Sequence, residues 1–167
     1  MPQSQRLADT PPELVIRAFQ PGDESAFRAL NEEWITRYFA LEPKDEKIFA
    51  DPKATILDPG GQILFALLDG RHVGCCALLR TSPTEFELSK LAVSQEHQGA
   101  GIGRKLFEAV IRYGRAAGAT RLYLDTNHTL IPAIRLYESL GFRHIDPARI
   151  TPSPYARTDV YMELVFA

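Results

Sequence analysis

Residues 98–105 read QGAGIGRK, and this stretch decides the fold that we expect for the chain. Three glycines within five positions permit a tight turn and let the backbone come close to a ligand. A strongly amphipathic segment follows, so the unpaired N–H groups and the positive dipole end of the predicted helix point into the glycine loop. Arg104 and Lys105 add positive charge in its first turn. The stretch therefore predicts an anion-binding site, and phosphate is the expected ligand.

Two common nucleotide-binding motifs do not fit this spacing. A dinucleotide fingerprint needs a further glycine at position 104, where this chain has Arg104. A P-loop needs Gly-Lys-Ser/Thr after four intervening residues, and Arg104 again occupies the decisive position after Gly99. Taken alone, the glycine loop is equally compatible with a structural turn, so a second motif has to decide.

That second motif lies downstream, where residues 132–142 read PAIRLYESLGF. Pro132 suits the first turn of a helix and Gly141 suits the position after its end, so the motif predicts a short helix. Together the two motifs resemble the Gcn5-related N-acetyltransferase (GNAT) superfamily, with its patterns Q/R-x-x-G-x-G/A and A-I-x-L-Y-x-x-x-G-F. The matching residues are Gln98, Gly101 and Gly103 in the first pattern, and Ala133, Ile134, Leu136, Tyr137, Gly141 and Phe142 in the second.

The resemblance implies an α/β fold of the GNAT type, with a mixed, mostly antiparallel central sheet that is flanked by helices and whose central strands splay apart. The chain has 167 residues, of which 45% are hydrophobic and 24% charged, and these values suit one globular domain. We expect residues 13–167 to form this single GNAT acetyltransferase domain. Residues 1–12 are polar and proline-rich, and we expect them to be a disordered lead.

Hydrophobic periodicity and turn-forming residues predict the individual elements. Strands are expected at residues 14–19, 62–68, 72–81, 85–93, 121–126, 142–145 and 159–166, with an Asp-Gly turn between the second and third. Helices are expected after Asp23, at 43–50, from 102 to Gly118 and from Pro132 to Gly141. The predicted inward faces are Phe27, Leu30, Trp34 and Tyr38 in the first helix, and Ile102, Leu106, Ala109, Val110, Tyr113 and Ala117 in the helix after the glycine loop.

Composition and charge argue against several functional classes. A net charge of −2 argues against a nucleic-acid-binding surface. No apolar run approaches the ~18 residues that a membrane helix needs. The two cysteines, Cys75 and Cys76, are neighbours on a predicted strand, so they point to opposite faces and suit a reducing cytoplasm. The four histidines lack metal-ligand spacing, so we expect no metal.

For the donor, the resemblance implies acetyl-CoA as an acyl-donor cosubstrate. The backbone N–H groups of the glycine loop would hold its pyrophosphate, and the edge of the preceding strand would pair with the pantetheine arm. The N–H of Leu91 would then donate to the thioester carbonyl. The expected cofactor-binding residues are Leu91, Ala92, Val93, Gln98, Gly99, Ala100, Gly101, Ile102, Gly103, Arg104, Lys105, Asn127, Ala133 and Tyr137. Asn127 is included because many members of the family have an asparagine at the position of Leu130, and Asn127 could replace it from the neighbouring loop.

For catalysis, Tyr137 matches the family's usual general acid, which protonates the departing sulfur. The alternative is an aromatic side chain that only packs its helix onto the sheet. Glu87 matches the position from which some members deprotonate the substrate ammonium, directly or through water. The alternative is that Glu87 orients the substrate or pairs with Lys90 or Arg80. With the N–H of Leu91, these residues form the expected catalytic set.

For the acceptor, the resemblance points to the first two helices, the strand that carries Glu87 and the loop before the last strand. We expect Trp34, Tyr38, Glu42, Glu87 and Tyr155 to bind a cationic amine by charge and cation–π attraction. A packed aromatic stripe beside a solvated acidic face is the structural alternative.

These expectations lead to an N-acetyltransferase that moves an acetyl group from acetyl-CoA to a primary amine by direct attack in a ternary complex. The acceptor is a small-molecule or a protein amine, with no nucleic acid and no membrane as partner, and a homodimer stays open. A non-catalytic acyl-CoA-binding regulatory module and an enzyme for longer acyl groups are the two alternatives.

Overall fold

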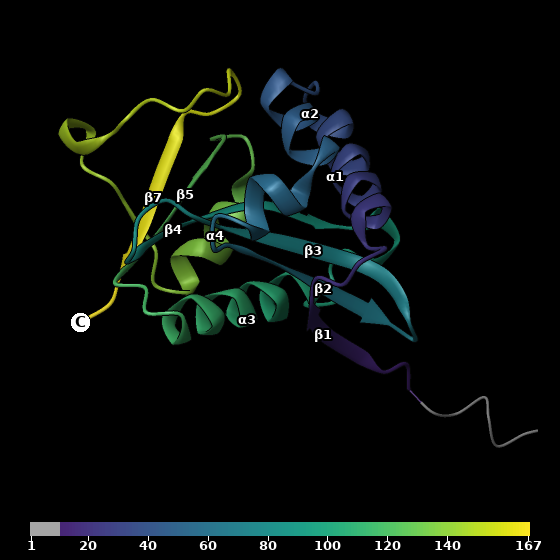
Figure 1. Ribbon diagram of the computed structural model, residues 1–167. Coiled ribbons are helices and arrows are strands. Elements are labelled where there is room, and N and C mark those ends of the chain that lie inside the picture. The colour runs from purple at the N-terminus through teal and green to yellow at the C-terminus, as the bar shows by residue number, and fades with distance from the viewer. Residues whose placement is uncertain (1–10) are drawn as a thin grey trace, which may run out of the picture.

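The computed structural model describes residues 11–167, and at its centre lies a seven-stranded sheet (Figure 1). The strand order is β1-β2-β3-β4-β5-β7-β6, and every neighbouring pair is antiparallel except β4 and β5. This confirms the mixed, mostly antiparallel sheet that the resemblance implied. The strands are β1 (Leu14–Ala18), β2 (Gln62–Leu68), β3 (Arg71–Arg80), β4 (Glu85–Val93), β5 (Arg121–Thr126), β6 (Arg143–His144) and β7 (Val160–Val165).

Helices cover both faces of the sheet. The helices α3 and α4 pack on one face, and α1 and α2 pack on the other together with a π-helical turn at Lys53–Leu57 (Figure 1). The sequence did not predict that turn. The predicted lead at residues 1–12 falls outside the described residues except for its last two positions. The helices are α1 (Glu24–Tyr38), α2 (Pro43–Ala50), α3 (Ile102–Ala116) and α4 (Ile131–Ser139).

The β2–β3 hairpin and the two cysteines follow their predictions. Asp69 and Gly70 have φ values of 49° and 79°, the left-handed conformations that a two-residue hairpin turn with the favoured twist requires. Cys75 belongs to the core cluster under α1 and α2, whereas Cys76 belongs to the cluster under α3 and α4. Adjacent residues of β3 therefore face opposite sides of the sheet. Burial raises the pKa of Cys75 to about 12, so the thiol stays protonated and inert.

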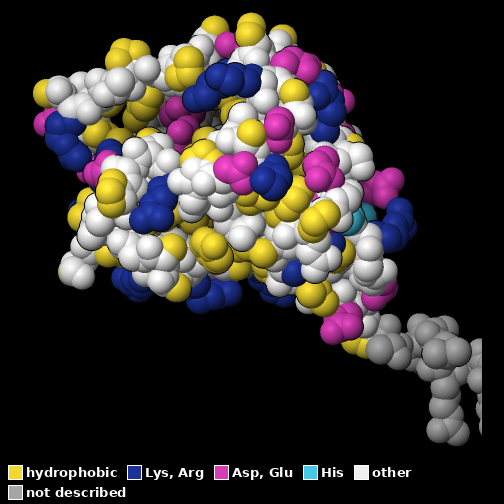
Figure 2. Space-filling view, viewed as in Figure 1, with side chains coloured by type: hydrophobic (Ala, Val, Ile, Leu, Met, Phe, Trp, Pro, Cys, Tyr) yellow, Lys and Arg dark blue, Asp and Glu magenta, His cyan; other side chains and the backbone are white. Residues whose placement is uncertain are grey.

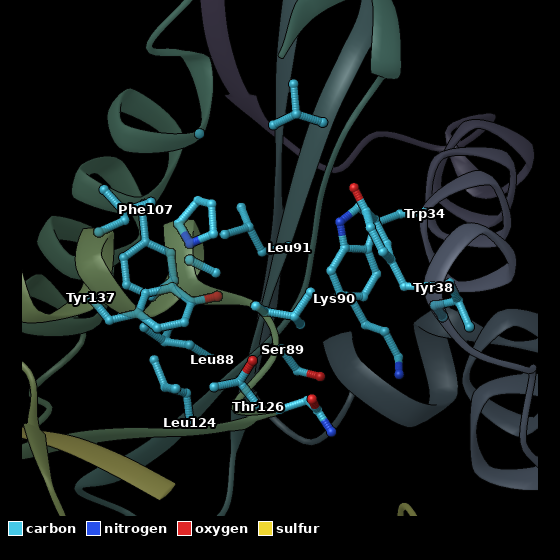
Figure 3. Close-up of a pocket in the computed structure, with 18 of the residues that line it drawn as sticks. Trp34, Tyr38, Leu88, Ser89, Lys90, Leu91, Phe107, Leu124, Thr126 and Tyr137 are labelled. Atoms are coloured by element: carbon cyan, nitrogen blue, oxygen red, sulfur yellow. The ribbon is translucent and has the colours of Figure 1, made fainter. Parts of the chain in front are cut away.

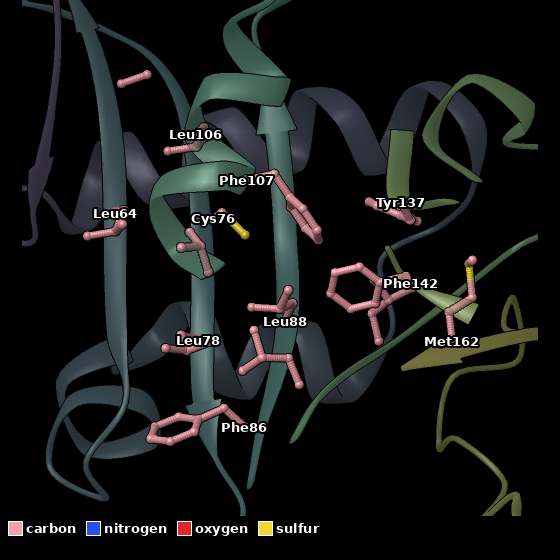
Figure 4. Packing of buried hydrophobic residues seen from close by; sticks show 14 of the residues in the cluster. Leu64, Cys76, Leu78, Phe86, Leu88, Leu106, Phe107, Tyr137, Phe142 and Met162 are labelled. Atoms are coloured by element: carbon pink, nitrogen blue, oxygen red, sulfur yellow. The ribbon is translucent and has the colours of Figure 1, made fainter. Parts of the chain in front are cut away.

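The core that positions the site lies between the sheet and the pair α3 and α4. Phe107 of α3 packs against the rings of Tyr137 and Phe142, with ring centroids 4.9 Å and 5.6 Å away (Figure 4). Burial of each large apolar side chain of this kind stabilises the fold by roughly 1.5–3 kcal/mol. The packing fixes α4 against α3 and thereby fixes the residue that closes one side of the cavity described below.

The inward faces of two helices differ from the prediction. In α3, Phe107 and Gly114 are buried, whereas Tyr113 and Ala117 are exposed. The reason is close packing, because a Cβ atom at Gly114 would lie 3.0 Å from Leu122 Cδ2, so the helix presents its glycine to the sheet. In α1, the buried positions are Phe27, Leu30, Asn31 and Ile35, while Trp34 is half-buried and Tyr38 is 46% exposed.

Candidate active site

A cavity of about 540 Å³ lies between β4 and β5 and reaches both faces of the sheet. Figure 3 shows Tyr137 and Phe107 on one side, Trp34 and Tyr38 on the other, and Leu91 of β4 between them. We call the side formed by residues 98–103 and Tyr137 the loop end. We call the side formed by Trp34, Tyr38, Asp125 and Tyr155 the aromatic end.

The cavity exists because β4 and β5 pair over only three residues. The parallel ladder joins Glu85–Glu87 to Arg121–Tyr123 and then stops, so within residues 11–167 the remaining length of β4 has no partner strand on that side. On its other side, β4 pairs with β3 through a bulge, in which the partners jump from Ala77↔Ser89 to Cys75↔Ala92. A bulge bends the strand that carries it and increases its local twist.

The backbone of β4 turns its free N–H groups into this gap. The carbonyl of Lys90 accepts a hydrogen bond from Cys75 Sγ of β3 at 3.5 Å. In a trans peptide the N–H of the next residue points the opposite way, so the N–H of Leu91 points away from β3 and toward the cavity. Farther along the strand, Ser94 N donates to Val73 O of β3 at 2.8 Å. Alternation then directs the N–H of Val93 into the gap as well.

At the loop end, the glycine loop leads straight into α3. Gly99 and Gly101 have φ values of 83° and 80°, and nothing lies within 4 Å of a Cβ atom built on either. Gly101 caps the helix, so the first unpaired N–H groups of α3 open onto the loop. Such a concave set of N–H groups at a helix N-terminus suits the phosphates of a nucleotide or of coenzyme A.

The structure brings most of the expected cofactor-binding residues to the cavity wall. The ones that do not line it are Ala92, which is fully buried, and Ala100, Arg104 and Lys105. The Arg104 guanidinium instead donates to Ser139 Oγ at 2.6 Å and joins the start of α3 to the end of α4. The lining residues of the set are Leu91, Val93, Gln98, Gly99, Gly101, Ile102, Gly103, Asn127, Ala133 and Tyr137.

Tyr137 points its hydroxyl into the middle of the cavity from α4 (Figure 3). Its ring is buried against Phe107, and the side chain as a whole is only 8% exposed. Burial raises the pKa of the phenol well above its usual range, with smaller contributions from Cys76 and Asp125. The phenol therefore stays protonated at neutral pH, which is the state that a proton donor needs.

Asn127 also lines the cavity, but its amide is engaged within the protein. Its Nδ2 donates to the carbonyl of Arg157 at 2.8 Å, and its Oδ1 accepts from Thr129 N at 2.9 Å. The residue therefore joins the end of β5 to the chain that enters β7. Its expected contact with the cofactor stays a prediction.

At the aromatic end, Trp34, Tyr38 and Tyr155 line the cavity, as expected for acceptor-binding residues. Glu42 and Glu87 do not. Glu42 caps α2, accepts from Ala156 N at 3.0 Å and forms an ion pair with Arg157 at 3.2 Å. Glu87 is half-buried, and burial raises the pKa of its carboxyl, with the charge of Asp125 adding to the rise. The role of Glu87 in acid–base catalysis stays a prediction.

Asp125 is the carboxylate that lines the cavity, and sequence reasoning missed it. It faces the aromatic end from β5 and accepts from Thr158 Oγ1 at 3.2 Å. Strand alternation could have found it. Leu122 and Leu124 are buried toward α3, so Asp125 must face the opposite side.

A buried ionic cluster behind the aromatic end was also missed. Asp45 of α2 accepts from Lys90 Nζ at 2.6 Å and from both terminal nitrogens of Arg157 at 2.8 Å and 2.9 Å. Burial alone would raise the pKa of Asp45, but the hydrogen bonds from Arg157 and Lys90 outweigh it and hold the pKa well below its usual range. No local sequence pattern signals this cluster, because its members come from three distant segments.

The space-filling view shows how this end of the molecule opens to the surface. A hollow lies beneath the chain that joins β6 to β7, with acidic side chains inside it and basic side chains along its rim (Figure 2). Within residues 11–167, no three His, Cys, Asp or Glu side chains are grouped so that they could hold a metal ion. In the same part of the chain, no helix has the length and hydropathy needed to cross a membrane.

Comparisons with known proteins agree on one family. Residues 24–142 match the acetyltransferase (GNAT) family. An uncharacterized N-acetyltransferase of Schizosaccharomyces pombe is 32% identical over 149 residues, which covers 86% of this chain and 89% of that protein. A mycothiol acetyltransferase of Acidothermus cellulolyticus is 35% identical over 155 residues, covering 80% of this chain but only 46% of that relative. The chain thus spans about half the length of that enzyme.

A solved structure gives the same answer for the fold. A putative acetyltransferase of Salmonella typhimurium, solved with its cofactor acetyl-CoA, superimposes with a TM-score of 0.72. The match covers 92% of this chain and 94% of that chain at 23% sequence identity. At this level of identity the match supports the fold alone.

Proposed function

The chain belongs to the acetyltransferase (GNAT) family, and from this we propose that it moves the acetyl group of acetyl-CoA directly to the nitrogen of a primary amine. One observation carries the proposal. A single cavity connects a glycine loop at a helix N-terminus, a backbone edge of β4, a phenol and a carboxylate among aromatic rings. Those are the groups that acyl transfer from a phosphate-bearing thioester to an amine requires.

The donor would bind along the loop end. The N–H groups at the start of α3 and the positive end of its dipole would hold the pyrophosphate. The N–H of Val93 would pair with the pantetheine arm in the way that a peptide adds to the edge of a sheet, which leaves the N–H of Leu91 for the thioester carbonyl. The fit is supported by the glycine loop, because Gly99 and Gly101 leave open the space that a Cβ atom would fill.

The acceptor must lose a proton before it attacks. A primary alkyl amine has a pKa near that of lysine, ~10.4, so it is mostly an ammonium at neutral pH. Asp125 lies on the wall of the cavity and is placed to take this proton, directly or through water. Glu87 lies on the neighbouring strand β4. Its raised pKa makes its carboxylate a suitable acceptor for the proton that Asp125 takes up.

Transfer then needs two groups of this chain. The amine nitrogen bonds to the carbonyl carbon, and the N–H of Leu91 stabilises the negative charge that develops on the carbonyl oxygen. As the C–S bond breaks, Tyr137 gives its phenolic proton to the departing sulfur, the attacking nitrogen releases its second proton to solvent to give the amide, and Tyr137 later regains a proton from solvent. The nucleophile is the acceptor amine itself, because the buried Cys75 and Cys76 have raised pKa values and are poor candidates for carrying the acyl group.

The test is turnover with a defined panel of acceptors. The purified protein is incubated with acetyl-CoA and with polyamines, amino acids, arylalkylamines and peptides that carry N-terminal or lysine amines, while free thiol is measured. We expect turnover on one class of amine, and a kcat that falls at least about 100-fold in Tyr137→Phe, the lower end for loss of a general acid.

The matched control is Tyr113→Phe, which removes the same hydroxyl from an exposed position of α3 and should leave kcat unchanged. A longer acyl-CoA in the same assay tests the donor preference. If acetyl-CoA binds but no amine of any class releases thiol above the rate without protein, a non-catalytic acyl-CoA-binding module replaces this proposal.

A further inference from the structure

Lys90 has an unusual backbone conformation for its position. Among the described residues, Asp69 and Lys90 are the two non-glycine residues with positive φ. Asp69 lies in a hairpin turn that requires this conformation, whereas Lys90 lies within β4 with a φ of 56°. A long side chain in the left-handed region costs free energy, and it persists only where the surrounding structure holds it there.

The side chain of Lys90 is held on the side of the aromatic end. It is 4% exposed, and its ammonium donates to Asp45 Oδ1 at 2.6 Å and to the Tyr155 hydroxyl at 2.9 Å. Asp45 is fully buried and is fixed in turn by Arg157, and its Oδ2 also accepts from Glu42 N at 2.9 Å. Moving the ammonium would leave Asp45 short of a partner inside the protein, which is expensive.

The main chain of Lys90 is held from the opposite direction. Its carbonyl faces Cys75 Sγ of β3, so the peptide that joins it to Leu91 is oriented by β3 on one side and by the anchored side chain on the other. The N–H of this peptide points into the cavity. In Figure 3, Leu91 and Lys90 lie between the Tyr137 hydroxyl and the aromatic end.

We propose that Lys90 is a positioning residue, whose ammonium, anchored on Asp45 and Tyr155, locks the bulge of β4 and aims the N–H of Leu91 at the reacting carbonyl. This inference rests on the proposed function. One ionic cluster then fixes two parts of the site, because Arg157, which also binds Asp45, holds the chain that carries Tyr155. Lys90 lines the cavity, but its ammonium is directed at Asp45 and Tyr155 rather than left free for the acceptor.

The first test is the steady-state kinetics of Lys90→Met, which keeps most of the length of the side chain and removes its charge and its hydrogen-bond donors. We expect kcat to fall by about 10- to 100-fold, less than the full loss of an oxyanion donor. The KM for acetyl-CoA should stay within about twofold, because the loop that holds the phosphates is untouched. Lys47→Met, at an exposed position of α2, is the control and should leave both constants unchanged.

A second variant guards against simple misfolding. Lys90→Gly tolerates the positive φ without strain and removes the anchor, so it should fold and still lose kcat. If either variant is folded, as its circular dichroism spectrum shows, and keeps its kcat, the positioning role is overturned even where the melting temperature falls. If only the KM for the amine rises, Lys90 serves the acceptor and the proposal is equally overturned.

A spectroscopic test does not depend on turnover. In ¹⁵N-labelled protein, acetyl-CoA should move the Leu91 amide proton downfield relative to coenzyme A that lacks the acetyl group. In Lys90→Met this movement should be lost, while the Gly101 and Gly103 amides shift as in the parent. An unchanged Leu91 shift in the variant refutes the inference alone. Glycine amides that do not respond to acetyl-CoA in the parent protein refute the proposed function, and this inference with it.

Discussion

The two ends of the cavity are made of different groups. At the loop end, the main contributors are the unpaired backbone N–H groups at the start of α3 and the open backbone of Gly99 and Gly101, and Tyr137 is the main side chain that takes part. At the aromatic end, the contributors are side chains, and the buried charges of Asp45 and Lys90 hold them in place. A backbone site needs a particular chain conformation, whereas a side-chain site needs particular partners. The two ends should therefore respond differently to mutation.

The largest expected effect of a mutation is a loss of stability at the aromatic end. Asp45→Asn removes the carboxylate shared by Lys90 and Arg157, so that Lys90 loses its ion pair and Arg157 keeps only the one with Glu42. Breaking a buried ion cluster in this way should lower the free energy of unfolding by about 3–5 kcal/mol. Urea denaturation followed by tryptophan fluorescence measures this, because Trp34 is the single tryptophan and lies at the same end.

The matched control for this prediction is Asp58→Asn. Asp58 pairs with Lys53 at 2.9 Å, but its side chain is 56% exposed. Its loss should change the stability by no more than about 0.5 kcal/mol. If both variants lower the free energy of unfolding by the same amount, the buried charges at the aromatic end stabilise the protein no more than exposed ones do.

A mutation at the loop end is expected to have an intermediate effect, on both stability and acetyl-CoA binding. Gly101→Ala places a Cβ atom in open space but at a φ of 80°, so it should cost about 1–2 kcal/mol of stability through the backbone alone. It should also weaken acetyl-CoA binding about tenfold, roughly the worth of one charge-assisted hydrogen bond to a phosphate. Thermal unfolding and isothermal titration calorimetry measure the two effects.

Gly118 supplies the control, because it follows the other end of α3 with a φ of 90° and equally open space. Gly118→Ala should lose the same stability and bind acetyl-CoA normally. If both variants bind acetyl-CoA alike, the glycine loop has only a structural role.

The smallest effect on activity is expected for a carboxylate outside the cavity. Asp23 of the β1–α1 turn accepts from Arg17 at 2.6 Å, and this bond lowers the pKa of the carboxyl to about 2 in spite of its burial. The folded pKa lies below the ordinary value of 3.8, so the stabilisation is complete above about pH 4 and is lost as the pH falls toward 2. Asp23→Asn should therefore be less stable at pH 7, by a difference that shrinks below pH 4.

Acid titration of the unfolding midpoint checks this prediction, and acetyl transfer by Asp23→Asn at pH 7 should match the parent. We distinguish charges that support the site from charges that support only the fold. A large loss of activity in Asp23→Asn would show that this distinction is wrong.

Much of the fold could be predicted because its signals are local. The strand at residues 85–93 and the helix at 43–50 have the predicted bounds, since alternation, proline and capping residues act within a few positions. The inward face of α3 could not be predicted in full. Whether Gly114 or Tyr113 faces the sheet depends on the space left by Leu122, a residue of the next strand.

The sequence by itself determined the loop end, because the contacts that define it lie within short motifs. The residues from Gln98 to Gly103 are contiguous, and the motif that carries Tyr137 is equally short. Their chemistry is that of a turn and a helix terminus, which neighbouring residues specify without help from the rest of the chain.

Only the tertiary structure decided the aromatic end. Asp45 lies 45 positions from Lys90 and 112 positions from Arg157, so no window of sequence contains the cluster. The same holds for Asp125, which reaches the cavity because β5 diverges from β4 after three paired residues. Burial strengthens the electrostatic interactions of these charges, because the dielectric constant inside the protein is low. Burial is a property of the packed chain rather than of any segment.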